Sequence, residues 1–115
     1  MDDCIFCKIA NGEINAGVVR KTPEFVAFRD IKPVAPTHVL VVPTAHLSAV
    51  RDAKGDAGHR TLGRMLAFAA EVAAELGLDS GGYRIVTNTG RDGGQSVDHL
   101  HLHVLGGRPM TWPPG

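Results

Sequence analysis

The sequence lacks several features that mark secreted, membrane-spanning or nucleic-acid-binding proteins. It contains only two cysteines, and 12 basic residues balance 12 acidic ones, which leaves a net charge of zero. A neutral chain has no long-range field to attract nucleic acid or anionic lipid. No apolar run approaches the roughly 20 residues of a membrane span, and the acidic N-terminal segment MDDCIFCKIA is unlike a signal peptide. We therefore expect a cytoplasmic protein without nucleic-acid or membrane partners.

Length and cysteine count together limit the architecture. A chain of 115 residues usually forms one domain and can bury a core without crosslinks. We expect a single domain over residues 1–115, whose last segment, 108–115, is a proline-rich tail. With two cysteines and no export signal, Cys4 and Cys7 are better explained as metal ligands or free thiols than as a structural disulfide.

The apolar patterning predicts two helices of unequal length. Residues 4–13 form a short helix that ends near Asn11-Gly12, a helix-breaking pair. In the helical region 45–79, apolar residues recur every three or four positions, and Gly77 is placed to end the helix. The apolar stripe of this main helix comprises Leu62, Met65, Leu66, Ala69, Val72, Ala73 and Leu76.

Alternating or continuous apolar runs also predict about five strands. Most are joined by short links, which favour an antiparallel sheet with the main helix on one face, an α+β fold. The strands are predicted over residues 17–22, 24–30, 38–43, 83–88 and 98–106.

Three of the six histidines stand on alternate residues. His99, His101 and His103 are separated by apolar residues in the run HLHLHVL. Because successive side chains of a strand point to opposite faces, the three imidazoles should share one face. Such a row can ligate a metal, can provide a nucleophile flanked by two polarising groups, or can be simply a polar strand face. The last interpretation is weak, because polar strand faces usually carry Thr, Lys, Glu and Ser.

A glycine-rich segment comes immediately before these histidines. It begins at Asn88 and ends with Gly94, Gln95 and Ser96. Glycines let backbone N–H groups approach a ligand closely, and Ser96 adds a hydroxyl donor. Many such loops are only hairpin turns, but the position beside a row of imidazoles favours a phosphate-binding site.

Taken together, these segments resemble the histidine triad (HIT) family, and within it the Hint branch. The run HLHLHVL fits the triad pattern, and GGQSVDHLHLHVLGGRPMTWPPG resembles that branch through to its Trp-Pro-Pro-Gly ending. The segments CIFCKIANGEI, AFRDIKPVAPTHVLVVPTAH and NTGRDGGQS match in the same order. The resemblance covers nearly the whole chain. It implies a HIT-like fold, with about five antiparallel strands, one main helix and a short N-terminal helix.

The resemblance implies hydrolysis of purine nucleoside 5′-phosphoramidates to the nucleoside monophosphate, without a catalytic cofactor. His101 is then the nucleophile, which forms a covalent nucleotidyl-histidine that water cleaves. The other implied catalytic residues are His38, Ser96, His99 and His103. The implied nucleotide contacts come from Asp30, Ile31, Asn88, Gly94, Gln95, Ser96, His101, His103 and Trp112.

Individual roles follow from the same mapping. His38 and His103 contact the phosphate region, and Ser96 donates toward the leaving group or a phosphate oxygen. Asp30 accepts from the ribose hydroxyls, and Ile31 packs against the base. From the residues alone, Asp30 is equally well explained as a turn residue ahead of a proline.

The Cys4-x-x-Cys7 pair is ambiguous by itself among zinc binding, redox chemistry and chance. The resemblance supplies two further ligands, His46 and His99, because several bacterial family members bind zinc through such a set. It therefore implies a structural zinc with four protein ligands and no open position. This site would tie the N-terminal helix to the triad segment.

The resemblance also implies a homodimer, in which two chains form one continuous sheet and the tail 108–115 reaches the partner's active site. Trp112, the only tryptophan, lies in that tail, and an exposed aromatic suits an interface. A frayed terminus is the alternative. Asp98 departs from the branch, which often carries an aromatic or apolar residue there, and the alternation directs it away from the histidine face.

Three other functions stay open on the sequence. A dinucleoside polyphosphate hydrolase or nucleotidyl transferase would use the same histidine with a different leaving group. A regulatory protein would bind purine nucleotides with little turnover. A metal-dependent hydrolase would use the triad as ligands.

Overall fold

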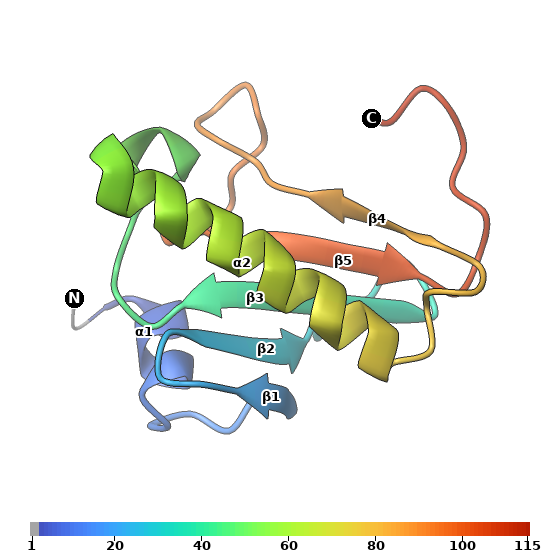
Figure 1. The fold of residues 1–115 in the computed structure, drawn as a ribbon, viewed down its shortest axis with the longest axis horizontal. Helices are drawn as coiled ribbons and strands as arrows, with labels where there is room; N and C mark the ends of the chain where they lie inside the picture. Colours follow the sequence, from blue (N-terminus) through green and yellow to red (C-terminus); the bar gives the residue numbers. More distant parts are fainter. Residues whose placement is uncertain (1–2) are drawn as a thin grey trace.

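The computed structural model, which describes residues 3–115, contains one five-stranded antiparallel sheet (Figure 1). The strand order is β1-β2-β3-β5-β4, so β1 and β4 are the edges. The predicted α+β fold is therefore confirmed. The strands are β1 (Val18–Lys21), β2 (Phe25–Arg29), β3 (Thr37–Pro43), β4 (Tyr83–Val86) and β5 (Leu102–Gly106).

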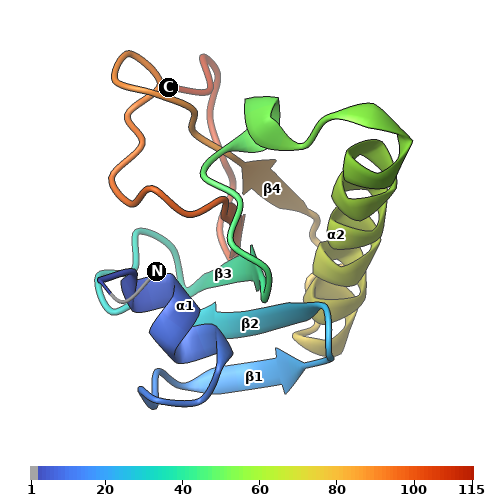
Figure 2. The ribbon, with the colours of Figure 1, turned by 90° about the vertical axis from the view of Figure 1, so that its left-hand side faces the viewer.

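Two α-helices lie on opposite faces of this sheet (Figure 2). The short helix α1 (Ile5–Ala10) covers one face, and the long helix α2 (Gly55–Glu75) covers the other. The predicted helical region 45–79 was too long: a 3₁₀ turn, Val50–Asp52, precedes α2, and residues 45–49 are not helical. The carbonyl of Leu47 instead accepts the N–H of Leu100 at 2.6 Å. None of the described helices is both long and apolar enough to cross a bilayer.

Gly77 ends α2 as predicted. Its φ of +76° lies in the left-handed region, which glycine adopts without the steric penalty of a Cβ. The N–H of Gly77 donates to Ala74 at 3.0 Å, and that of Leu78 donates to Ala73 at 2.9 Å. These bonds satisfy carbonyls that the last turn would otherwise leave unpaired.

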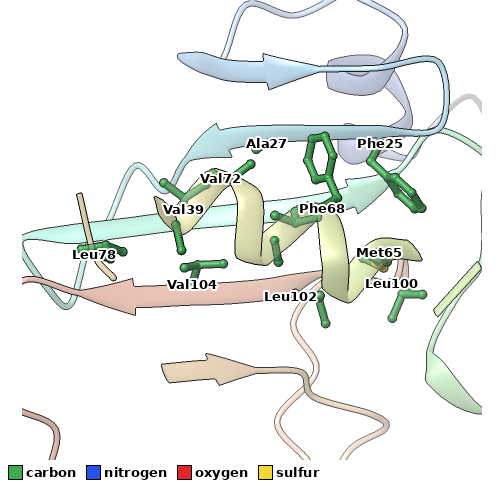
Figure 3. Close-up of a cluster of buried hydrophobic side chains, with 13 residues drawn as sticks. Phe25, Ala27, Val39, Met65, Phe68, Val72, Leu78, Leu100, Leu102 and Val104 are labelled. Atoms are coloured by element: carbon green, nitrogen blue, oxygen red, sulfur yellow. The ribbon is translucent and has the colours of Figure 1, made fainter. Parts of the chain in front are cut away.

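The α2 face of the sheet packs into a dry hydrophobic core (Figure 3). The prediction for the α2 stripe is confirmed for its central residues but wrong for Leu66, whose side chain is 50% exposed. The buried residues of this core are Phe25, Ala27, Val39, Val41, Met65, Phe68, Ala69, Val72, Ala73, Leu78, Leu100, Leu102 and Val104. On the other face, α1 closes a smaller apolar cluster of Phe6, Ile9, Ala10, Val26, Phe28, Leu40 and Val42.

The last strand is shorter than the predicted 98–106. It begins at Leu102, because the preceding segment makes its hydrogen bonds elsewhere. The N–H of Leu100 bonds to Leu47, and the hydroxyl of Thr87 donates to the carbonyl of His101 at 2.9 Å. Of the three triad histidines, only His103 lies within β5. The prediction that the three imidazoles share one face is nevertheless confirmed. Phe6 of α1 packs against both His99 and His101, and His101 packs against His103, whereas Leu100, Leu102 and Val104 lie in the core on the α2 face.

Candidate active site

A pocket of about 450 Å³ opens on the α1 face of the sheet, beside two of the triad histidines. His101 and His103 stand at its wall, together with Ser96 from the preceding segment. Asp30 and Ile31, which follow β2, line it from the other side. The structure thus brings together five residues that the sequence assigned to the site.

The rest of the pocket wall is mostly apolar and comes largely from α1 and the segment after it. The side chain of Phe6 packs edge-on against His101, with ring centroids 5.1 Å apart. Ile31 is 89% exposed at the pocket, where an apolar partner such as a base could cover it. The sequence did not predict the remaining wall residues, although the three- and four-residue spacing of the first three was a signal for one helix face. They are Ile5, Phe6, Ile9, Ile14, Asn15, Ala16, Phe28, Arg29, Leu40 and Val97.

The ring of His101 is oriented by the main chain of its own segment. Its Nδ1 lies 2.7 Å from the carbonyl oxygen of His99. A carbonyl only accepts, so Nδ1 carries the proton and Nε2 keeps its lone pair. The imidazole is 3% exposed, and its ring reaches the pocket. His101 is therefore held in the tautomer that a nucleophile attacking through Nε2 requires.

Next to His101, the side chains of His38 and His103 form a hydrogen-bonded pair. Nε2 of His38 lies 2.8 Å from Nδ1 of His103 and 3.4 Å from Oδ2 of Asp30. Burial lowers the pKa of His38, although Asp30 acts in the opposite direction. Burial and the neighbouring His101 and His38 lower the pKa of His103 to about 4. Both rings are therefore neutral at pH 7, and the 3.4 Å approach of Asp30 to His38 is a polar contact rather than an ion pair.

The glycine-rich loop is braced by its own side chains and backbone. Asn88 donates to the carbonyl of Gly93 at 2.7 Å, and Gln95 donates to the carbonyls of Ser48 and Val97 at 2.6 and 3.0 Å. A Cβ on Gly93 would lie only 2.3 Å from the carbonyl oxygen of Thr89, so glycine is required there.

Two backbone donors of this loop are used within it. The N–H groups of Gly94 and Gln95 donate to the carbonyls of Arg91 and Gly90. Gly94, Gln95 and Ser96 are the consecutive residues of this loop that the family resemblance assigns to the nucleotide. Of their three backbone N–H groups, that of Ser96 is the one without an intramolecular partner among the described residues. The loop therefore offers its donors to a ligand chiefly at Ser96, at the edge of the pocket.

A second cluster lies behind the triad segment and can hold a metal. The donor atoms of Cys4, Cys7, His46 and His99 all lie within 4.8 Å of one another. Nδ1 of His99 is 3.2 Å from Sγ of Cys4, and Nδ1 of His46 is 3.2 Å from Sγ of Cys7. Tetrahedral zinc with ordinary Zn–S and Zn–N bonds would separate such atoms by about 3.5 Å, so the donor set fits.

The remaining nitrogen of His99 supports this assignment. Nε2 donates to the carbonyl of Pro43 at 2.9 Å, which leaves the Nδ1 lone pair facing the sulfurs. Such an outer-shell acceptor is typical of metal-ligating histidines. Burial and the adjacent Cys4 raise the pKa of the Cys7 thiol, and a bound cation would reverse that effect. The His99 side chain is fully buried, and both of its ring nitrogens are used, one by Pro43 and one by the cluster. Its backbone carbonyl accepts the hydrogen bond from Nδ1 of His101.

The structure also places predicted residues that do not line the pocket. Asn88, Gly94 and Gln95 belong to the braced loop described above. Trp112 is 83% exposed in the C-terminal tail, as the prediction for a single chain requires. Asp98 is exposed and lines a separate hollow of about 550 Å³ beside Cys4 and Ser96, outside the pocket that contains His101.

The sheet thus presents the middle histidine of the triad run, in a fixed tautomer, beside a pocket. The sequence model of the HIT domain matches residues 11–110. This chain belongs to the HIT family.

Named relatives extend over almost the whole chain. It is 46% identical over 114 residues to an uncharacterized HIT-like protein of Synechocystis, covering 99% of this chain and 98% of that protein. It is 43% identical over 109 residues to the purine nucleoside phosphoramidase of Escherichia coli K12, covering 95% and 91%. Among solved structures, a HIT family hydrolase from Legionella pneumophila matches with a TM-score of 0.93 and 50% identity, covering 98% and 100%. A histidine triad protein from Clostridium difficile matches with 0.92 and 42%, covering 96% of each.

Proposed function

We propose that this chain hydrolyses purine nucleoside 5′-phosphoramidates to the nucleoside monophosphate and an amine. The observation that carries the proposal is His101, whose Nδ1–H donates to the carbonyl of His99 and leaves Nε2 free at the pocket. The named activity of the Escherichia coli relative, at 43% identity, supports the same reaction.

The first step forms a bond between Nε2 of His101 and the α-phosphorus, while the bond from phosphorus to the amine nitrogen breaks. The electron pair of that bond leaves with the amine, which takes up a proton from solvent, while Ser96 donates a hydrogen bond at this edge of the pocket. The charge that develops on the His101 ring is stabilised by the Nδ1–H donation to His99, which is only 2.7 Å long.

In the second step the oxygen of a water molecule bonds to phosphorus and releases a proton to solvent, while the bond from phosphorus to Nε2 breaks. The nucleoside monophosphate leaves and His101 returns to its starting tautomer. Splitting one displacement into two is the usual gain from covalent catalysis. Through both steps His103 donates toward the phosphate, Asp30 accepts from the ribose, and Ile31 covers the base.

The alternatives use the same residues differently. A dinucleoside polyphosphate hydrolase or nucleotidyl transferase would release a nucleotide or pass the nucleotidyl group to another acceptor. A regulatory protein would bind purine nucleotides without turnover. The phosphoramidase is preferred because a named relative with that activity aligns over 95% of this chain.

Rapid-quench mass spectrometry tests the proposal. Wild-type protein mixed with an adenosine or guanosine phosphoramidate and quenched without acid should carry one nucleotidyl group on His101. His101→Ala should carry none and should lose at least about 10³-fold in kcat, as expected for a removed nucleophile. His59→Ala, which removes an exposed histidine of α2, is the matched control. Turnover by His101→Ala at the native rate would refute the assignment, and nucleotide binding without any turnover would favour the regulatory protein.

A structural zinc at Cys4, Cys7, His46 and His99 is part of the proposal. The mutual distances and the Pro43 acceptor support it. When bound, the ion would supply charge that keeps both thiolates deprotonated and would tie α1 to the triad segment. Free cysteines and thiolate ligands suit a reducing compartment, which is why we propose a cytoplasmic location.

A homodimer is also proposed, with residues 1–115 acting as one HIT domain and the tail 108–115 reaching the partner's pocket. The open edge of β4 and the exposed side chains of Leu66 and Trp112 support it. An edge strand offers unpaired N–H and C=O groups to a second chain. Light scattering of the purified protein should give twice the chain mass.

A further inference from the structure

The second triad histidine of the pocket, His103, is also held in one tautomer, and the cause lies outside the triad. Its Nδ1 meets Nε2 of His38 at 2.8 Å, and one of these two nitrogens must carry the proton. The distance alone does not say which. The other nitrogen of His38 decides it.

Nδ1 of His38 lies 3.1 Å from the backbone nitrogen of Val34. A backbone N–H can only donate, so Nδ1 of His38 must be an acceptor. In a neutral imidazole the proton then sits on Nε2, which donates to Nδ1 of His103. That forces the proton of His103 onto its Nε2, where it is available to a phosphate oxygen.

The Val34 amide belongs to a restrained loop between β2 and β3. Prolines at positions 33 and 36 fix φ on both sides of it. Asp30 closes the start of the loop, because its Oδ1 accepts the N–H of Lys32 at 2.8 Å and its own N–H donates to the carbonyl of His38 at 3.0 Å. The side chain of Val34 is 61% exposed, so the residue contributes mainly through its backbone.

Arg108 holds the same residue from the opposite side. Its Nη2 and Nε donate to the carbonyl oxygen of Val34 at 2.9 and 3.3 Å, and Nη1 donates to the carbonyl of Pro109 at 3.1 Å. A continuous series of bonds therefore runs from the C-terminal tail through Val34 and His38 to His103. Arg108 has no place in the pocket itself.

We infer that the backbone N–H of Val34, anchored by Arg108, is the device that sets the proton on Nε2 of His103. Arg108 is thus a positioning residue for the reaction, acting through Val34 and His38. This inference rests on the proposed function for its kinetic consequence, but the tautomer itself is independent of turnover. The groups that face His103 are His101, His38 and Asp30, and none of them needs to change its charge.

The test uses full-length protein and two readouts. Ring ¹⁵N shifts at pH 7 should show His103 protonated on Nε2 and His38 protonated on Nε2. Val34→Pro deletes the N–H, and Val34→Ala keeps it while removing most of the side chain. Val34→Pro should mix the tautomers of both rings and lower kcat by about 10-fold, at the low end of outer-shell effects, with KM little changed. Val34→Ala should match wild type in both readouts.

Arg108 variants decide the matter if Val34→Pro does not fold. Arg108→Ala should populate both tautomers of His103 to some extent and lower kcat a few-fold. Arg108→Lys, which keeps a single donor group, should recover part of the lost kcat. Arg84→Ala is the matched control, because Arg84 also donates to a tail carbonyl, that of Thr111 at 2.8 Å, without contact to the loop. All variants are compared at the oligomeric state of wild type.

The outcomes separate the inference from the function on which it rests. A wild-type His103 protonated on Nδ1, or unchanged tautomers in the folded Val34 and Arg108 variants, would overturn the inference whatever the activity. The predicted tautomers in a protein without turnover would leave the positioning intact and reject the proposed function.

Discussion

The two faces of one sheet carry different kinds of side chain, and β3 shows the division most clearly. Val39 and Val41 point toward α2 and are fully buried in the large apolar core. Leu40, which alternates with them, lines the pocket on the α1 face, and His38 contacts the pocket residue His103. Successive side chains of a strand point to opposite faces. Neighbouring residues of β3 therefore serve different purposes, with one set packing in the core and the other standing on the side of the pocket.

The faces also differ in how their polar groups are satisfied. The α2 core consists of apolar residues, so its stability comes from burial and packing. The α1 face buries three imidazoles at His38, His99 and His101, each with hydrogen-bond partners. Buried polar groups cost free energy unless paired. The α1 face is therefore stable only with its network complete, and the same network fixes the tautomers that catalysis requires.

The largest expected effect comes from the α2 face. Phe68→Ala removes a side chain that is 4% exposed and packs against Phe25, with ring centroids 5.5 Å apart. It should lower the free energy of unfolding by about 3–5 kcal/mol, while kcat per folded molecule stays near wild type. Urea unfolding and initial rates at low denaturant measure both. A large loss of kcat in folded Phe68→Ala would show that the division between faces is wrong, and His59→Ala controls for mutation of α2 itself.

Metal removal should distinguish the two sites of the α1 face, the pocket with His101 and the cluster of Cys4, Cys7, His46 and His99, because only the cluster should respond to it. A chelator should lower the unfolding free energy by about 3–4 kcal/mol if the free metal was 100 to 1,000 times its Kd, since ligand binding to the folded state is lost. Hydrolysis at temperatures where the protein stays folded should continue. Cys7→Ser should show the lowered stability without chelator and no further response to it. Loss of turnover with unchanged melting would instead indicate a catalytic metal.

A smaller effect is expected within the pocket at Asp30. Asp30→Asn keeps an acceptor for the N–H of Lys32 but removes the carboxylate charge. A hydrogen bond to a charged group contributes about 1.5 kcal/mol at the low end, so kcat/KM for a ribonucleoside phosphoramidate should fall about 10-fold. The matched 2′,3′-dideoxy substrate should be equally good for both proteins. Equal losses on both substrates would assign Asp30 to His38 rather than to the ribose.

Much of the α2 face was predictable from the sequence, because periodicity reports directly on burial. The central α2 residues, the Gly77 cap and the existence of strands β2 and β3 depend on local patterns alone. Leu66 failed because a stripe three and four residues apart is wider than the surface that the sheet covers, and its edge stays exposed.

The α1 face was predictable only in part, because its geometry depends on contacts between distant segments. The hydrogen bond from Leu100 to Leu47 ends the predicted strand early. On the shared face, His99 turns to the sulfurs of Cys4 and Cys7, whereas His101 and His103 line the pocket. The role of the Val34 N–H has no side-chain signature at all. Residue types indicated which chemistry was present, whereas backbone hydrogen bonds decided which nitrogen faces which partner.

The last comparison concerns the pH dependence of stability, in which the two faces should differ directly. The folded pKa of His103 is about 4, below the ordinary value of 6.5, so between these values the unfolded chain binds a proton that the folded chain does not. Its contribution to stability is thus intact above pH 6.5 and is lost as pH falls toward 4. Burial lowers the pKa of His38 and His99 in the same direction.

Urea unfolding from pH 4 to 8 should therefore show a slope that His103→Gln makes shallower. Phe68→Ala should move the whole curve downward with its slope unchanged, because its neighbours in the α2 core do not titrate. Surface carboxylates contribute equally to all three proteins and cancel in the differences. A slope that His103→Gln leaves unchanged would mean that the imidazole is not held neutral by the fold, and the contrast between a titrating and a non-titrating face would then reduce to one of packing alone.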